Sequence, residues 1–166
     1  MTFQELIQKR QSIRKYQDKP VEKEKLDRIL EAGRLAPSAK NDQDWKFIMV
    51  TDEKTRAAIC KGIPQDFAKQ APVLLLGCGK KEALPMRCGQ PRNAIDLGIA
   101  TAFMHLQLTE LGLGACWMGN FEADVAAEAV GLEEDMTVLT LSTVGYAAEK
   151  PPRKARKAHD EVCFYK

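Results

Sequence analysis

The sequence has no long hydrophobic run, and this absence sets the first limit on what the chain can be. No stretch reaches the ~18 consecutive apolar residues that a membrane-spanning helix requires. The N-terminal sequence MTFQELIQKRQS contains neither an apolar core nor a small-residue cleavage site, so it does not resemble a signal peptide. We therefore expect a cytoplasmic protein that does not bind membranes.

Metal-binding and hydrolase motifs are also missing. The five cysteines stand far apart and form no CxxC pair, so we expect free thiols rather than a disulfide framework or a zinc site. There are only two histidines, and no HExxH, GxSxG or Walker A pattern occurs. His105 lies in an apolar segment, where a hydrogen-bonded core or interface role is favoured over a catalytic base. The sequence thus predicts no metal site and no catalytic side chain of these kinds.

The glycine fingerprint of a Rossmann dinucleotide site is incomplete. Gly77 and Gly79 follow an expected strand, but Glu82 stands where the third glycine belongs. Gly112 and Gly114 follow an expected helix instead of a strand. These glycines are therefore expected to make turns, and no such nicotinamide site is predicted.

What remains is an ordinary globular composition. The 166 residues are 45% hydrophobic and 29% charged, which argues against disorder. The net charge of +2 is too small to indicate nucleic acid or a membrane surface as a partner. We expect one domain over residues 1–166, with a proline-rich, basic tail at about 147–166.

Hydrophobic periodicity and turn residues predict a mixture of helices and strands. Helices are expected at residues 2–10, 23–36, 52–61, 94–111 and 123–130, and strands at 46–51, 72–78, 116–117 and 138–144. Thr2 and Glu5 have the spacing of a capping box for the first helix. Because the elements do not alternate strictly as βαβ units, we predict an α+β fold.

The helix at 94–111 is apolar on two faces. One face carries Leu97, Thr101, Met104, Leu108 and Leu111, and the other carries Ile95, Ile99, Ala102 and Leu106. A helix of this kind is buried on both sides, so it runs through the core or between subunits.

Two polar clusters could bind a ligand. In an extended segment Arg10, Ser12 and Arg14 point the same way, and two guanidiniums with a hydroxyl suit a phosphate monoester. The plainer alternative is a solvated basic surface. The loop Pro37-Ser38-Ala39-Lys40-Asn41-Asp42-Gln43-Asp44-Trp45 offers donors and acceptors for the edge of a heterocycle such as a flavin pyrimidine. An ordinary capped loop is the alternative there.

A third cluster is the segment from Gly114 to Asn120. Gly119 lets the backbone approach a flat ligand, and a backbone N–H could bond a ring nitrogen. Alternatively, Trp117 and Met118 are core residues.

Taken in order, these clusters resemble the FMN-dependent nitroreductase family over nearly the whole chain. The matching segments are Arg10-x-Ser12-x-Arg14, Pro37-Ser38-Ala39-x-Asn41-x-Gln43-x-Trp45, Ala71-Pro72-Val73, Asp96-x-Gly98-Ile99-Ala100, Gly112-Leu113-Gly114-Ala115-Cys116-Trp117-Met118-Gly119 and Gly145-Tyr146. The resemblance implies an α+β sandwich with a mixed central sheet flanked by helices. It also implies an intertwined homodimer with two FMN sites at the interface, and a tail that reaches the partner subunit.

The resemblance also assigns roles to residues. Arg10, Ser12 and Arg14 would hold the phosphate and the pyrimidine side of FMN, and Lys154 and Arg156 would reach the phosphate. Pro37, Ser38, Ala39, Asn41 and Gln43 would contact FMN from the partner subunit, and Met118 and Gly119 would lie at the flavin ring.

The implied activity is ping-pong hydride transfer from NADH or NADPH, through FMN, to a small acceptor such as a nitroaromatic or a quinone. No side chain is needed as acid or base. Two alternatives remain open: a flavin-binding module without turnover, and a relative with other flavin chemistry such as dehalogenation or flavin fragmentation.

The sequence departs from the family pattern in two places. Asp44 replaces a frequent proline, which predicts a less rigid loop with an extra carboxylate near the site. The stretch between Cys78 and Arg92 is too short for the helical lid of larger members, which predicts an open substrate face.

Overall fold

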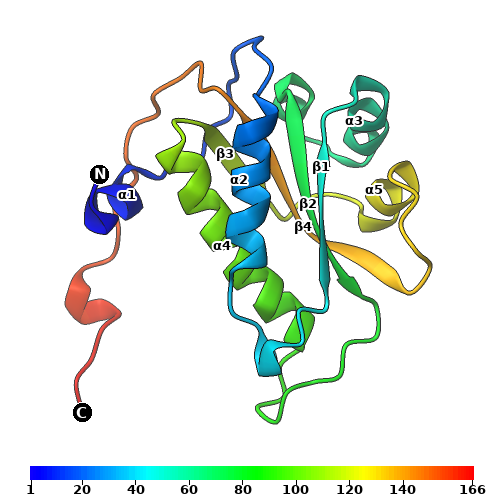
Figure 1. Ribbon diagram of the computed structural model, residues 1–166. Coiled ribbons are helices and arrows are strands. Elements are labelled where there is room, and N and C mark those ends of the chain that lie inside the picture. Colours follow the sequence, from blue (N-terminus) through cyan, green and yellow to red (C-terminus); the bar gives the residue numbers. More distant parts are fainter.

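One four-stranded sheet forms the centre of the chain in the computed structural model, which describes residues 1–166 (Figure 1). Its strands are β1 (Trp45–Val50), β2 (Val73–Lys80), β3 (Gly114–Met118) and β4 (Met136–Gly145). They lie side by side in the order β1-β2-β4-β3, and all three neighbouring pairs are antiparallel.

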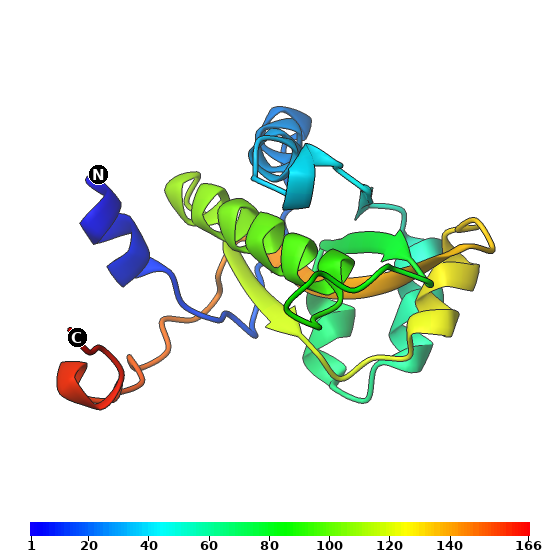
Figure 2. The same ribbon diagram turned by 90° about the horizontal axis from the view of Figure 1, so that it is seen from below.

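Helices cover both faces of this sheet (Figure 2). Helices α2 (Lys23–Arg34) and α4 (Arg92–Glu110) lie on one face, and α3 (Glu53–Ile59) and α5 (Ala123–Ala129) lie on the other. The predicted α+β class is confirmed. Each predicted helix and strand is present, and its bounds differ from the predicted ones by at most two residues at either end.

The central strand β2 shows why its sequence is apolar throughout. Leu74 and Leu76 pack in the core beneath α3 and α5, whereas Val73 and Leu75 pack against α2 and α4. Successive side chains point to opposite faces of a strand. A strand covered on both faces therefore needs an apolar residue at every position.

The sheet differs from the mixed sheet that was expected. Strands β2 and β3 do run parallel, since each is antiparallel to β4, and α4 is the crossover between them. However, β4 lies between these two strands, so no parallel neighbours form. Parallel pairing does occur outside the sheet order, at an isolated bridge between Ser12 and Ala115 of β3.

The two apolar faces of α4 have different surroundings. Leu97, Ala100, Met104 and Leu108 are buried against the sheet and α2. On the outer face Ile95 is 38% exposed and Phe103 is 44% exposed. The inner face thus accounts for the core, while Ile95 and Phe103 on the outer face stay exposed, even though α1 packs beside the C-terminal half of the helix.

Both ends of the chain project from the body on the same side (Figure 1). Helix α1 (Phe3–Lys9) begins with the predicted capping box of Thr2 and Glu5, yet none of its residues is buried. The tail ends in the short helix η4 (His159–Glu161). Neither these segments nor any other helix has the length and apolarity that a bilayer crossing needs.

Candidate functional site

The segment after α1 runs along the edge strand β3 and is anchored there by two core residues. The Ile13 amide donates to the Ala115 carbonyl at 3.0 Å. Ile13 and Tyr16 are both buried, and the Tyr16 hydroxyl donates to the Ile13 carbonyl at 2.6 Å. Because alternate side chains of an extended segment point in opposite directions, burial of Ile13 turns its neighbours Ser12 and Arg14 outward.

The cavities on the two sides of this segment agree with the predicted alternation. Gln11 and Ile13 line a cavity of about 510 Å³ on one side. Arg10 lines a cavity of about 390 Å³ between α1 and α4. Arg14 lines a smaller one of about 190 Å³. Trp117, which is 58% exposed, borders both the Arg10 cavity and the Arg14 cavity, so the two meet at this side chain.

The Arg14 cavity joins the first and third predicted clusters. Met118 and Gly119 line it together with Arg14. A Cβ added at Gly119 would meet no atom within 4 Å, so open space lies over this backbone. The Arg14 guanidinium lies 6.0 Å from the centre of the Phe67 ring. A cation, a bare stretch of backbone and open space together suit a flat polar ligand.

Cys116 lines this cavity but is a packed, buried residue. It is 3% exposed and belongs to the core beneath α3 and α5. Burial raises the pKa of its thiol, while the nearby charge of Arg14 and a hydrogen bond with Ser12 oppose that rise. The geometry agrees with a structural cysteine.

The cations of the site have no carboxylate partner within the chain. None of the ion pairs in the structure includes Arg10, Arg14, Lys154 or Arg156. Burial lowers the pKa of the Arg10 guanidinium, and the positive charge of Arg156 lowers it further. Two like charges brought together without a counterion favour a bound anion.

Of the C-terminal basic pair, Lys154 and Arg156, only Arg156 lies near Arg10. Arg156 is exposed but lies near enough to Arg10 to affect its pKa. Lys154 is exposed, and no contact links it to the site. Its predicted role in phosphate binding stays a prediction.

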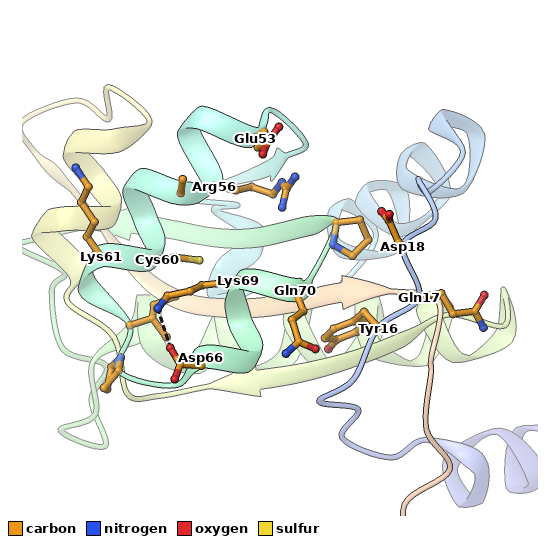
Figure 3. A pocket seen from close by; sticks show the side chains of 14 residues that line it. Tyr16, Gln17, Asp18, Glu53, Arg56, Cys60, Lys61, Asp66, Lys69 and Gln70 are labelled. Atoms are coloured by element: carbon orange, nitrogen blue, oxygen red, sulfur yellow. Dashed lines mark hydrogen bonds and ion pairs between the residues drawn. The ribbon is translucent and has the colours of Figure 1, made fainter.

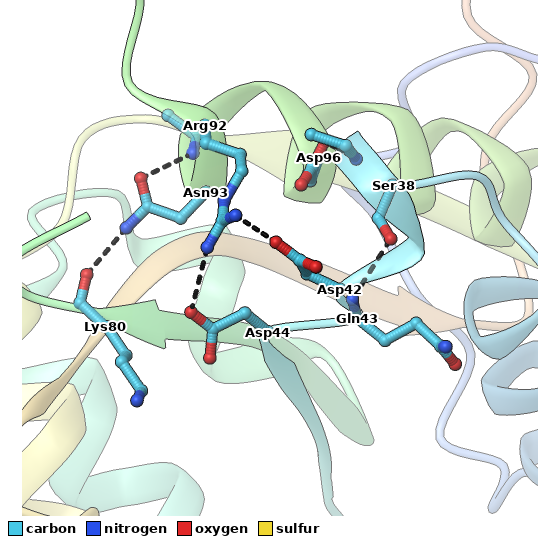
Figure 4. Close-up of polar contacts among 10 residues, drawn as sticks. Ser38, Asp42, Gln43, Asp44, Lys80, Arg92, Asn93 and Asp96 are labelled. Carbon is cyan, nitrogen blue, oxygen red and sulfur yellow. Dashed lines mark hydrogen bonds and ion pairs between the residues drawn. The ribbon is translucent and has the colours of Figure 1, made fainter. Parts of the chain in front are cut away.

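The second predicted cluster, the loop at 37–43, lies at the start of α4 (Figure 4). The Gln43 amide donates to Ser38 Oγ at 3.1 Å, and Gln43 Nε2 donates to the Asn41 carbonyl at 3.1 Å. The Ala39 amide donates to Asp96 Oδ1 at 3.1 Å. Pro37 is exposed directly after α2. These contacts give the loop a defined shape attached to α4.

Within one chain this loop does not reach the arginine cluster. The loop contacts Asp96 of α4, whereas Arg10 shares a cavity with His105 of the same helix. Nine residues of α-helix correspond to a rise of roughly 13 Å. The cavities lined by Arg10 and by Arg14 include no residue of the loop.

Asp44, the extra carboxylate predicted for this loop, is paired with a cation of α4. Arg92 Nη2 lies 3.7 Å from Asp44 Oδ2, and Arg92 also pairs with Asp42. The expected loss of rigidity is therefore opposed by two ion pairs, because Arg92 connects the loop to α4.

His105 has the core role that the sequence favoured. It is 6% exposed, and its Nε2 lies 2.8 Å from Ser142 Oγ. Burial lowers the pKa of the imidazole to about 4, with a further contribution from Arg10. His105 is consequently neutral near pH 7.

The largest cavity in the chain lies elsewhere and contains none of the predicted residues (Figure 3). It has a volume of about 900 Å³ and is lined by α3 and by the segments around Asp18 and Asp66. Lys69 pairs there with Asp66 at 2.7 Å and Arg56 donates to the Ala71 carbonyl at 2.8 Å. The three cations of its lining are balanced in number by the carboxylates of Asp18, Glu53 and Asp66. It offers no surplus positive charge of the kind that Arg10 and Arg14 provide.

Two residues of the Arg14 cavity were missed by the sequence reasoning. Gln65 and Phe67 line it from the segment at η3 (Asp66–Gln70). Gln65 Oε1 is buried without any hydrogen-bond partner, which is unusual for a buried acceptor. No periodic signal marks either residue, because the segment is irregular. Both lie shortly before Ala71-Pro72-Val73, one of the segments that match the family pattern.

Comparison with known proteins identifies the relatives of this fold. The model of the nitroreductase family matches residues 7–63 and 59–146. An FMN reductase [NAD(P)H] of Bacillus subtilis is 30% identical over 169 residues, which cover 91% of this chain and 68% of that protein.

Two solved structures cover almost the whole chain. A nitroreductase family protein of Clostridium difficile 630 has a TM-score of 0.88 and 33% identity, and covers 99% of this chain and 98% of its own. An FMN-dependent nitroreductase of Clostridium difficile R20291 has a TM-score of 0.81 and 31% identity, with coverages of 97% and 98%. With both sequence and fold in agreement, the chain belongs to the nitroreductase family.

Proposed function

We propose that the chain is an FMN-dependent oxidoreductase that takes a hydride from NADH or NADPH and reduces small acceptors such as nitroaromatics or quinones. The observation that carries this proposal is that Arg14 lies beside the open backbone at Met118 and Gly119, with Arg10 in the adjoining cavity, and that neither guanidinium pairs with a carboxylate. The relatives named as an FMN reductase and an FMN-dependent nitroreductase support it.

The residues present fit both the phosphate group and the ring system of FMN. Arg10 and Arg156 would hold the phosphate, because they are neighbouring cations without a carboxylate. Ser12 and Arg14 would bind the phosphate and pyrimidine sides. The buried Oε1 of Gln65 lacks a donor, and a ring N–H of the pyrimidine would supply one. The space over Gly119 would admit the ring itself.

The complete site requires a second copy of the chain. The outer face of α4 carries exposed apolar side chains at Ile95 and Phe103, which suits a homodimer interface. In such a dimer the loop residues Pro37, Ser38, Ala39, Asn41 and Gln43 of one copy would complete the FMN site of the other. The single domain of residues 1–166 would extend its tail at 147–166 along the partner subunit.

The residues of the chain bind and orient, and none is needed to move a proton. Bound FMN supplies reversible acceptance and donation of a hydride. His105 is the only titratable imidazole near the site, and its burial and its bond to Ser142 keep it out of acid–base chemistry. The positive charges of Arg10 and Arg14 would favour the anionic ring of the reduced cofactor over the neutral ring of the oxidised one.

One shared face for donor and acceptor predicts ping-pong kinetics. The fold has no second nucleotide site of the Rossmann type, so the donor must leave before the acceptor binds. Steady-state rates measured at several acceptor concentrations should give parallel double-reciprocal lines. Converging lines would rule out the shared face.

The first experiment is a visible absorption spectrum of the purified protein, followed by addition of NADH or NADPH without oxygen. A flavin spectrum that bleaches supports the oxidoreductase. A bound flavin that does not bleach indicates another donor or other flavin chemistry, such as dehalogenation or flavin fragmentation. No flavin after incubation with FMN would refute the proposed cofactor.

A further inference from the structure

We propose that Arg92 is a positioning residue, which holds the loop at 38–44 in the shape needed for FMN by pairing with Asp42 and Asp44. The inference rests on the proposed function, in which this loop contacts FMN. Neither the motifs of the sequence nor the family comparison pointed to Arg92.

The loop has an unfavourable backbone conformation. Lys40, Asn41 and Gln43 have φ angles of 56°, 57° and 52°. Asparagine tolerates this left-handed region, whereas lysine and glutamine seldom adopt it. Such a conformation persists only when surrounding contacts impose it.

The contacts inside the loop are few and exposed. They comprise the bonds from Gln43 to Ser38 and Asn41, and two turn bonds between backbone groups. Lys40, Asn41, Asp42 and Gln43 are all exposed to solvent. Water competes for these bonds, so they are weak restraints by themselves.

Helix α4 supplies the external restraint at two points. Asp96 accepts the Ala39 amide at 3.1 Å, and Arg92 pairs with both Asp42 and Asp44 (Figure 4). Arg92 and Asp96 are four residues apart, so they lie on the same face of the helix. The Arg92 side chain is only 22% exposed, which limits screening by solvent. The beginning and the end of the loop are thereby tied to one helix face.

Arg92 also neutralises the loop. Without it, Asp42 and Asp44 would be two nearby carboxylates with no cation paired to either. They would repel each other, and they would oppose the binding of an anionic cofactor. Asp44 stands where the family pattern often has proline, so the ion pair replaces the stiffness of a proline ring.

The first test compares FMN affinity among apo-protein variants by fluorescence titration. Arg92→Met should bind FMN about tenfold more weakly, since two partly buried ion pairs are lost. Arg92→Lys keeps the charge but loses the planar guanidinium that reaches both carboxylates, so it should show an intermediate loss of about threefold. The matched control is Lys23→Met, which breaks the exposed Lys23–Asp27 pair of 2.6 Å on α2 and should change nothing. Unchanged affinity in Arg92→Met overturns the inference.

The second test asks whether Arg92 acts through the two carboxylates. In a protein carrying Asp42→Asn and Asp44→Asn, adding Arg92→Met should change FMN affinity by less than about twofold. A full tenfold loss in that background would show that Arg92 acts in another way, and would refute the positioning role.

The third test does not depend on FMN. Hydrogen exchange of the Asn41, Asp42 and Gln43 amides should be about tenfold faster in Arg92→Met than in wild type, and unchanged in Lys23→Met. Equal exchange rates of these amides in Arg92→Met and wild type would refute the proposal that Arg92 restrains the loop. If the wild-type protein binds no FMN, but exchange is still faster in Arg92→Met, the proposed function fails. The restraint of the loop by Arg92 is then still supported.

Discussion

At the scale of single residues, the proposed site depends on Arg10 and Arg14, whose guanidinium groups form no ion pair with a carboxylate of the chain. Arg14 is exposed and borders the open space over Gly119. We expect Arg14→Ala to weaken FMN binding by ~1.5–3 kcal/mol, the value of a charge-assisted hydrogen bond. Titration of the apo-protein with FMN measures this. Lys15→Ala is the matched control, because Lys15 is also exposed and unpaired but lines none of these cavities.

His105 predicts a pH dependence of stability at the same scale. Its folded pKa is lowered to about 4, so the unfolded chain binds the proton more tightly. The contribution of His105 to the free energy of unfolding is therefore fully present above the unfolded pKa. It is lost as the pH falls from about 6.5 toward 4. Lowering the pH from 7 to 5 should reduce the free energy of unfolding by about 2 kcal/mol through this residue.

The measurement is urea unfolding of wild type and His105→Gln at both pH values. Glutamine can still bond Ser142 but does not titrate in this range. The variant should lose about 2 kcal/mol less than wild type between the two pH values. Identical pH dependence would mean that His105 is not buried in its neutral form.

At the scale of elements, the contact between the extended segment and β3 aligns the arginines. A Cβ at Gly114 would lie 2.7 Å from Ile13 Cγ1, so Gly114→Ala must push the segment away from the strand. We expect a loss of ~1–3 kcal/mol in unfolding free energy together with weaker FMN binding. Chemical denaturation and FMN titration measure the two effects.

Gly119→Ala is the informative comparison for this element. An added methyl there meets no atom of the chain, so unfolding free energy should change by less than about 0.5 kcal/mol. FMN affinity should still fall, because the methyl occupies the space proposed for the ring. A variant that binds FMN normally would place the ring elsewhere.

At the scale of the whole molecule, the exposed apolar side chains on the outer face of α4 predict that dimerisation and FMN binding are linked. Phe103→Glu places a charge on this face, where Phe103 is 44% exposed in one chain. We expect the dimer dissociation constant to rise at least ~100-fold, because an unpaired carboxylate would be buried in the interface. Sedimentation velocity measures the oligomeric state, and FMN affinity should fall with it.

The control for the interface is Ala57→Glu, on the exposed side of α3 at the opposite face of the sheet. It adds the same charge but should leave both the dimer and FMN binding unchanged. A monomeric Phe103→Glu protein with normal FMN affinity would show that one chain forms the whole site.

Much of this architecture follows from local sequence. The order and type of the main helices and strands could be predicted because their signals are local: the capping box at Thr2, the apolar period of α2 and the unbroken apolar run of β2. The alternation of Arg10, Ser12 and Arg14 follows from the two-residue period of an extended chain. The short helix η3, by contrast, has no such period and was not predicted.

Only the tertiary structure decided which residues meet. It set β4 between two parallel strands, brought Gln65 and Phe67 to the Arg14 cavity, and paired Asp44 with Arg92. These contacts join residues far apart in the chain. They depend on how helices and strands pack against one another, which no local pattern of residues specifies. The sequence alone determined the elements and the residue types of a flavin site, whereas packing determined their arrangement in space.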